Sequence, residues 1–278
     1  MLDYKLNRDQ INFFNTFGFI LLKGLFLDKI EDIINCFEEV FELHSRNQKR
    51  NLNYVERKCI PQFIDSHKNL ANLIDDERII NIGKCILGNN FNYMGSDGNY
   101  YNSNTIWHSD GWKSNILHIK LAFYLDHLKQ NTGCLKVLPG SHLINDKYSK
   151  NLDLCFKKKN SYLNKLGAEV PGVSIETEPG DVICFNHNLK HSSFGGAKNR
   201  RMFTINLSQR YPEEKLRNLK DYINEGSRFW IDRAYGDIML NTASTERMKY
   251  LSQVLENEGE LKYNSMLARK KMQKPANG

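Results

Sequence analysis

The sequence predicts an all-β core with flanking helices, in the form of a two-sheet β barrel or jelly roll. Up to about residue 90 the apolar residues recur at helical spacing, and from Phe91 to Ser208 they follow several short strand-like segments separated by turns. After Pro212 the pattern becomes helical and polar again. We therefore expect one domain over residues 1–278, with a helical N-terminal support over 1–90, the barrel core over about 91–210 and a helical C-terminal tail over 211–278.

The N-terminal support is predicted to contain helices around one strand. Apolar residues at helical spacing mark the helices, and a capping residue or a glycine marks their ends. The predicted elements are a helix capped by Asn7 and ended by Gly18, a strand at 19–24, a second helix capped by Asp28, an irregular mobile loop at 44–60, and a helix at 67–87 ended by Gly88.

The predicted barrel begins at Phe91. On the strand expected at 116–125, Lys120, Ala122 and Tyr124 share one face, while five apolar residues share the other. The further predicted elements are an extended segment at 104–110, a short strand between two turns at 131–142, a polar loop at 145–165, two strands within 172–191, and a last strand at 200–208.

Composition is that of a soluble globular protein, with 40% hydrophobic and 26% charged residues. The net charge of +7 is spread along the chain, so we expect no nucleic-acid partner. The 6 cysteines form no Cys-x-x-Cys pair and are predicted to be reduced, buried thiols. Because the first residues carry charges before any apolar run, we expect no signal peptide, no membrane segment and a cytoplasmic protein; the oligomeric state is not predicted.

The predicted catalytic and metal site combines the segment Trp107-His108-Ser109-Asp110 with the distant His191. If this segment is extended, His108 and Asp110 leave the backbone on the same side. His191 follows a Pro-Gly-Asp turn and an apolar strand that ends at it. Two histidines and one carboxylate on one face of a metal are the ligand set of non-heme Fe(II) oxygenases. The alternative is a hydrogen-bonded pair of His108 and Asp110 with a structural role.

These residues and their order resemble the phytanoyl-CoA dioxygenase-like branch of the Fe(II)/2-oxoglutarate oxygenases. The resemblance covers about residues 5 to 210, and four motifs carry it. They are Phe17-Gly18-Phe19-Ile20-Leu21, Trp107-His108-Ser109-Asp110, Asn131-Thr132-Gly133-Cys134-Leu135 with Pro139-Gly140-Ser141-His142, and Pro179-Gly180-Asp181 through His191 to Arg200. The resemblance implies a double-stranded β-helix (a jelly roll or cupin-like barrel), with Fe(II) held by His108, Asp110 and His191. The spacing to Arg200 favours His191 over the nearby His187 as the third ligand.

The resemblance also implies that 2-oxoglutarate chelates the iron and that an arginine on the strand after His191 binds its far carboxylate. Arg200 and Arg201 face opposite sides of that strand, and Arg200 is favoured because Thr204 shares its face. Ser193 and Tyr124 are predicted to contact the cosubstrate as well. For Ser193, a structural turn serine is the alternative.

The implied reaction uses O2 and 2-oxoglutarate to hydroxylate an unactivated C–H bond of a small molecule, with release of succinate and CO2. Asp110 stands where a halogenating variant of the family has a small residue, so halogenation is not expected. Desaturation or oxidative cyclisation on the same scaffold remains open. Two other classes are a non-catalytic module that binds metal and 2-oxoglutarate, and a zinc hydrolase, against which Arg200 counts because hydrolysis needs no 2-oxoglutarate clamp.

The substrate is predicted to be a small polar metabolite, possibly anionic. Lys113, Trp112 and Tyr100 flank the metal-binding segment and are predicted to line the pocket mouth. We also expect the loop at 44–60 and the tail near Arg228, Trp230 and Arg233 to be free to fold over this mouth. The alternative is that these charges are ordinary surface and that the aromatic residues belong to the core.

Overall fold

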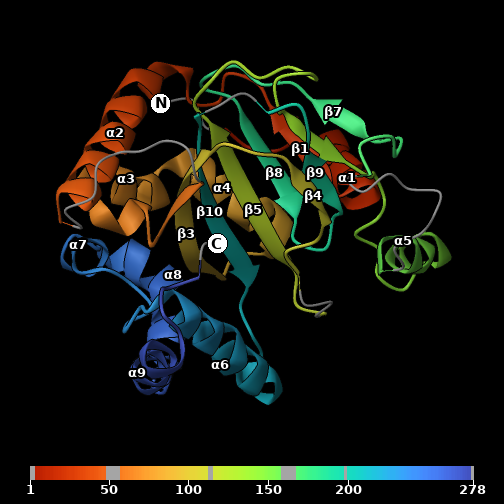
Figure 1. Cartoon of the computed structure of the whole chain (residues 1–278). Coiled ribbons are helices and arrows are strands. Elements are labelled where there is room, and N and C mark those ends of the chain that lie inside the picture. Colours follow the sequence, from red (N-terminus) through yellow and green to blue (C-terminus); the bar gives the residue numbers. More distant parts are fainter. Residues whose placement is uncertain (1–3, 48–56, 112–114, 158–166, 197–198, 277–278) are drawn as a thin grey trace.

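Two antiparallel sheets form the centre of the protein. The computed structural model describes residues 4–47, 57–111, 115–157, 167–196 and 199–276. The larger sheet has the strand order β1-β8-β5-β10-β3-β2 and the smaller one β4-β9-β6-β7. The strands are β1 (Phe19–Leu22), β2 (Lys58–Pro61), β3 (Phe91–Tyr101), β4 (Thr105–His108), β5 (His118–Tyr124), β6 (Leu135–Val137), β7 (Val173–Ile175), β8 (Val182–Asn186), β9 (His191–Ser193) and β10 (Arg200–Gln209). This arrangement confirms the predicted double-stranded β-helix with helices outside it (Figure 1).

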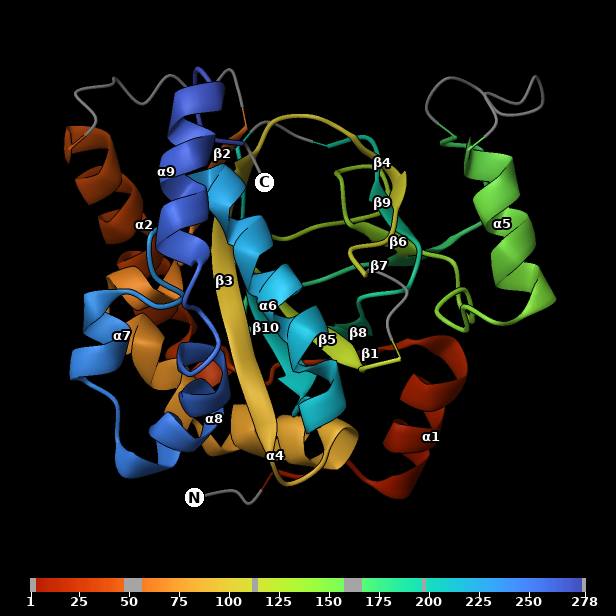
Figure 2. The ribbon, with the colours of Figure 1, turned by 90° about the horizontal axis from the view of Figure 1, so that it is seen from below.

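Helices cover the outer face of the larger sheet and continue beyond the barrel (Figures 1 and 2). The helices are α1 (Arg8–Phe17), α2 (Ile30–Asn47), α3 (Lys68–Ala71), α4 (Glu77–Leu87), α5 (Lys147–Lys157), α6 (Leu216–Asn224), α7 (Asp237–Asn241), α8 (Thr245–Leu255) and α9 (Leu261–Lys271). Within the described ranges no helix combines the length and the apolar character that crossing a membrane requires.

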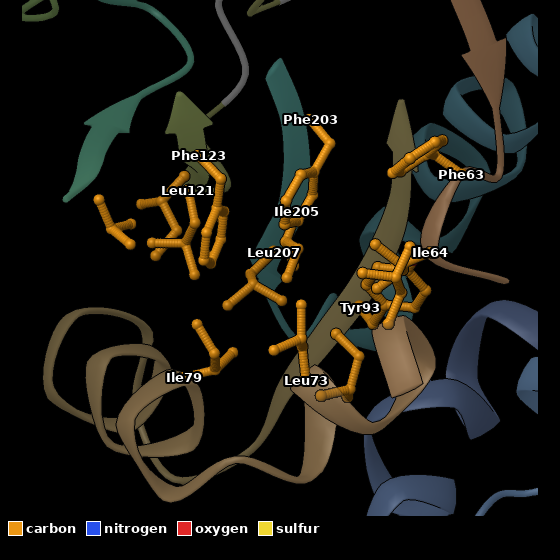
Figure 3. Packing of buried hydrophobic residues seen from close by; sticks show 14 of the residues in the cluster. Phe63, Ile64, Leu73, Ile79, Tyr93, Leu121, Phe123, Phe203, Ile205 and Leu207 are labelled. Atoms are coloured by element: carbon orange, nitrogen blue, oxygen red, sulfur yellow. The ribbon is translucent and has the colours of Figure 1, made fainter. Parts of the chain in front are cut away.

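The main core lies between the larger sheet and its helices. Alternate residues of β5 and β10, among them Leu121, Phe123 and Phe203, turn outward and pack against buried side chains of the helical layer such as Ile79 (Figure 3). The rings of Phe123 and Phe203 stack with their centroids 4.5 Å apart. The other face of these strands is thereby left free to line the interior of the barrel.

The N-terminal helices follow the sequence prediction with two corrections. The helix 8–17 has its predicted cap, because Asn7 and Gln10 form a reciprocal capping box. Asp28 is not a helix cap: it lies in a 3-10 turn, and Arg78 donates to its carboxylate at 2.6 Å. The predicted helix 67–87 is broken, because Asp76 leaves the helical conformation and caps α4 with its side chain.

Two predicted loops contain regular structure. In the segment 44–60, α2 continues to Asn47 and β2 pairs with β3, while residues 48–56 lie outside the described residues. The segment 145–165 contains α5, and in its first turn the Tyr148 N–H donates a hydrogen bond to the Asp146 carboxylate at 3.0 Å. The loop predictions are wrong for the described parts of both segments, because the strand depends on pairing with β3 and the polar face of α5 hid a helix.

The C-terminal tail packs against the body of the protein, so the expectation that it is free to move is wrong. Tyr235 stacks on Tyr93 and donates a hydrogen bond to its backbone carbonyl. The fully buried Arg247 donates to Asp75, which lies in the N-terminal helical layer. These contacts connect the tail to residues 65–93.

The 6 cysteines are free thiols, as predicted, but not all are buried. Three are buried, Cys59 and Cys85 are half-buried, and Cys155 on α5 is exposed.

Candidate metal centre

His108 and His191 are brought together by strand pairing. The two residues face each other in the register of β4 and β9, and their ring centroids lie 4.2 Å apart. His191 begins β9 rather than ending the strand before it, because β8 stops at Asn186 and a turn intervenes. Asp110 follows in the bend after β4, which the Gly111 N–H closes by donating to the His187 carbonyl at 2.7 Å. One ligand atom from each of His108, Asp110 and His191 lies within 4.8 Å of the other two.

Both histidine rings present Nε2 to this cluster. The Nδ1 atom of His108 lies 2.8 Å from the Ile106 carbonyl, and that of His191 lies 3.0 Å from the Leu189 carbonyl. Because a carbonyl only accepts, each Nδ1 carries the proton and each Nε2 keeps its lone pair. The two Nε2 atoms each lie 3.6 Å from an oxygen of Asp110. Two imidazole nitrogens and one carboxylate around a common point are a donor set that suits a divalent transition metal such as Fe(II).

Electrostatics keep the cluster in the protonation state that a metal needs. Burial lowers the pKa of His191 to about 4, so this ring is neutral at physiological pH. For Asp110, burial alone would raise the pKa, but the positive charge of Lys120 brings it well below its usual range. Lys120 on β5 donates to Asp110 Oδ2 at 2.7 Å. The ligand carboxylate is therefore ionised and oriented before any metal binds.

The cluster opens into a cavity of about 650 Å³ inside the barrel. Arg200, at the start of β10, lines this cavity and is only 4% exposed. Its guanidinium donates to the Ser193 hydroxyl at 2.5 Å, to the Ser103 carbonyl at 2.8 Å and to the Gly133 carbonyl. Its Nε is buried without a partner, and no carboxylate of the described residues pairs with it. A buried cation with an unused donor fits the carboxylate of a ligand.

Arg201 lies on the opposite side of the strand. It forms ion pairs with Asp126 at 2.6 Å and with Glu38 at 2.9 Å. Its guanidinium therefore contributes to the packing outside the barrel, whereas that of Arg200 faces the cavity.

The other predicted site residues have different outcomes. Ser193 is buried and donates to the Gly133 carbonyl at 2.8 Å, and Tyr124 is buried in the cavity wall, where burial raises the pKa of its hydroxyl. Tyr100 does not line the cavity, because alternation on β3 turns it outward against α2, where its hydroxyl donates to Glu38. Trp112 and Lys113 lie outside the described residues.

Several cavity residues were missed by the sequence prediction. Asp97 on β3 lies beside Thr204 in the strand register and faces the interior, a position that alternation from Tyr101 could have indicated. His187, the alternative ligand, is buried in the cavity wall and lies 3.2 Å from the Asn206 amide oxygen. The tail adds Tyr222, Glu225 and Phe229 to the lining, which only its packing reveals, and also Arg228, which was expected near the pocket mouth.

A model of the family described as phytanoyl-CoA dioxygenase matches residues 14–202 of the chain. The chain belongs to the phytanoyl-CoA dioxygenase family. As a member of this family with a His-Asp-His cluster, it is a non-heme Fe(II)- and 2-oxoglutarate-dependent dioxygenase. The C-terminal residues that line the cavity lie beyond the matched range.

Individual relatives of this family member are distant. The chain is 25% identical over 203 residues to a 2-aminoethylphosphonate dioxygenase from the uncultured bacterium HF130_AEPn_1, covering 66% of this chain and 73% of the relative. Its fold is similar to that of HygX from Streptomyces hygroscopicus, solved with nickel and 2-oxoglutarate bound, with a TM-score of 0.60, 15% identity and coverage of 75% and 89% of the two chains. EctD from S. alaskensis with bound Fe gives a TM-score of 0.55, 19% identity and coverage of 75% and 79%.

Proposed function

We propose that this dioxygenase hydroxylates an unactivated C–H bond of a small polar metabolite that carries an anionic group. In this proposal His108, Asp110 and His191 hold Fe(II), and Arg200 binds the far carboxylate of 2-oxoglutarate with Ser193 and Tyr124 beside it. The observation that carries the proposal is that the three metal-ligating side chains and a buried arginine without a carboxylate partner line the same cavity.

The protein's own residues bind and orient the reactants. When bound, Fe(II) and 2-oxoglutarate supply the oxidising chemistry, with O2 consumed and succinate and CO2 released. His108 and His191 offer Nε2 lone pairs because backbone carbonyls hold the Nδ1 protons. Lys120 holds one oxygen of Asp110 and fixes the orientation of that carboxylate. The guanidinium fork of Arg200 sets the direction of the cosubstrate along the cavity.

An anionic substrate is supported by the charge of the cavity wall. Besides Arg200, the cations Arg57 and Arg228 line the cavity, where Lys120 is already paired with Asp110. A cavity of this size suits a metabolite rather than a polymer. The 25% identical relative is a dioxygenase of 2-aminoethylphosphonate, a small molecule of this kind.

We also propose that all 278 residues act as one catalytic domain. The support is that the cavity wall combines barrel residues with Tyr222, Glu225 and Arg228 of the tail. The tail buries Tyr235, Met239 and Arg247, so it contributes to the core as well as to the cavity.

The test measures succinate formation with Fe(II), 2-oxoglutarate and a panel of small compounds added one at a time. The panel contains phosphonates, phosphate monoesters and carboxylates, each beside a neutral compound of the same carbon skeleton. We expect an anionic member to stimulate succinate release and to gain one oxygen atom, with His191→Ala inactive. Stimulation by the neutral members alone would contradict the anionic substrate, and a chain that turns over no 2-oxoglutarate with any compound would contradict the assigned reaction.

A further inference from the structure

One carboxylate inside the barrel, that of Asp97, forms no ion pair with any residue that the structure describes. Asp97 lines the cavity from β3 and accepts hydrogen bonds from two neutral donors, the Asn99 amide and the Thr204 hydroxyl. Within residues 4–47, 57–111, 115–157, 167–196 and 199–276, no nitrogen of a Lys, Arg or His side chain lies within 4.0 Å of an oxygen of this carboxylate. A carboxylate in a confined cavity is stabilised when a bound ligand brings the missing positive charge.

The nearby cations are already engaged elsewhere. Lys120 forms its ion pair with Asp110, and Arg57 donates to the Asn99 amide oxygen and to the Tyr101 hydroxyl. The negative charge of Asp97 therefore faces the cavity and remains available for a bound molecule.

Asp97 lies in the part of the cavity away from Arg200, where the substrate rather than 2-oxoglutarate would bind. Asp97 pairs with Thr204 on β10, four residues further along that strand than Arg200. Four residues of strand span about 13 Å, so Asp97 lies well away from the guanidinium that we assign to 2-oxoglutarate. Glu225, the other cavity carboxylate without an ionic partner in the described chain, lies in an exposed 3-10 segment of the tail. Asp97, by contrast, sits on a strand that is hydrogen-bonded on both sides.

We propose that Asp97 binds a cationic group of the substrate, most simply a protonated amine, so that the substrate is a small zwitterion. This inference rests on the proposed oxygenation of an anionic metabolite and adds the second charge. Asp97 suits the amine of such a substrate, and the guanidinium of Arg228 in the same cavity wall suits its acidic group.

The test compares three probes that differ in one charged group each. They are 2-aminoethylphosphonate, ethylphosphonate, which lacks the amine, and propylamine, which lacks the phosphonate. Binding is measured by calorimetry on the full chain loaded with Ni(II) and 2-oxoglutarate, so that no turnover is needed. The variants are Asp97→Asn, which keeps the size and an acceptor oxygen, and Asp221→Asn, which removes the same charge from an exposed position of α6 outside the cavity lining.

We expect Asp97→Asn to weaken 2-aminoethylphosphonate binding at least tenfold and to change ethylphosphonate binding less than twofold, while Asp221→Asn changes neither beyond twofold. Equal losses for both phosphonates would show a merely structural role and overturn the inference, as would ethylphosphonate binding the unaltered protein as tightly as its amine analogue. A larger loss in Glu225→Gln than in Asp97→Asn would also overturn it. If propylamine binds through Asp97 but neither phosphonate binds, the anionic substrate of the proposed function is wrong, while Asp97 is still the site that binds an amine. If neither 2-aminoethylphosphonate nor propylamine binds, the inference about Asp97 is wrong.

Discussion

Replacing Arg200 by alanine should mainly weaken the binding of 2-oxoglutarate. The guanidinium is 4% exposed, and without the cosubstrate it donates only to neutral oxygens. Removing one partner of a buried ion pair costs about 3–5 kcal/mol, which corresponds to a rise in the 2-oxoglutarate Kd of about two to four orders of magnitude. Arg200→Lys keeps the charge and loses the fork, so a smaller rise of about tenfold is expected.

The assay is calorimetric titration of 2-oxoglutarate into the Ni(II)-loaded protein, with thermal unfolding recorded in parallel. Arg201→Ala is the matched control, because Arg201 is the next residue of β10 and pairs with Asp126 and Glu38 outside the barrel. We expect that control to change the Kd for 2-oxoglutarate less than about twofold. A larger effect in Arg201→Ala than in Arg200→Ala, or an Arg200→Ala Kd within threefold of the unaltered protein, would refute the assignment.

Three further predictions follow from the geometry. His191→Ala should abolish Ni(II) binding while His187→Ala retains it, as measured by calorimetry; the opposite ranking would show that the ligand is misassigned. Arg247→Ala should lower the free energy of unfolding by about 3–5 kcal/mol in denaturant titration, because it leaves Asp75 unpaired beside a buried contact; a loss below about 1 kcal/mol would contradict this. Burial raises the pKa of Asp65 to about 6, above the value of about 4 in the unfolded chain. The protonated carboxyl group of Asp65 therefore stabilises the fold fully below about pH 4, and this stabilisation is lost as the pH rises to about 6. Unfolding at a series of pH values should show this loss in the unaltered protein and not in Asp65→Ala.

The sequence alone was sufficient to predict the barrel and to single out the three residues that form the His-Asp-His cluster. Alternation of apolar residues on short segments determines which face of each strand is buried, because the side-chain period of a strand is two. The order of the motifs around His108, Asp110 and His191 matched a known family, and the structure places these side chains in one cluster. Local capping at Asn7 was also predictable, since it depends on neighbours within three residues.

Elements without a distinct local signal were predicted poorly. The strand Lys58–Pro61 exists because it pairs with β3, and α5 carries a polar face that made it look like a loop. Asp28 has the residue type of a helix cap, but a contact with Arg78, 50 residues away in the chain, determines its position. Strand pairing and side-chain contacts with residues far away in the chain leave little signal in a short stretch of sequence.

Only the tertiary structure decided which polar residues share the cavity. Arg200 and Arg201 are chemically identical neighbours, and the register of β10 decides that one faces the cavity and the other Asp126. Tyr101 rather than Tyr100 lines the cavity for the same reason. Asp97 and Tyr222 join the site because a strand and a tail helix that are far apart in the sequence pack around one space. Period and motif are properties of the local sequence, whereas the composition of a cavity depends on how distant segments pack together.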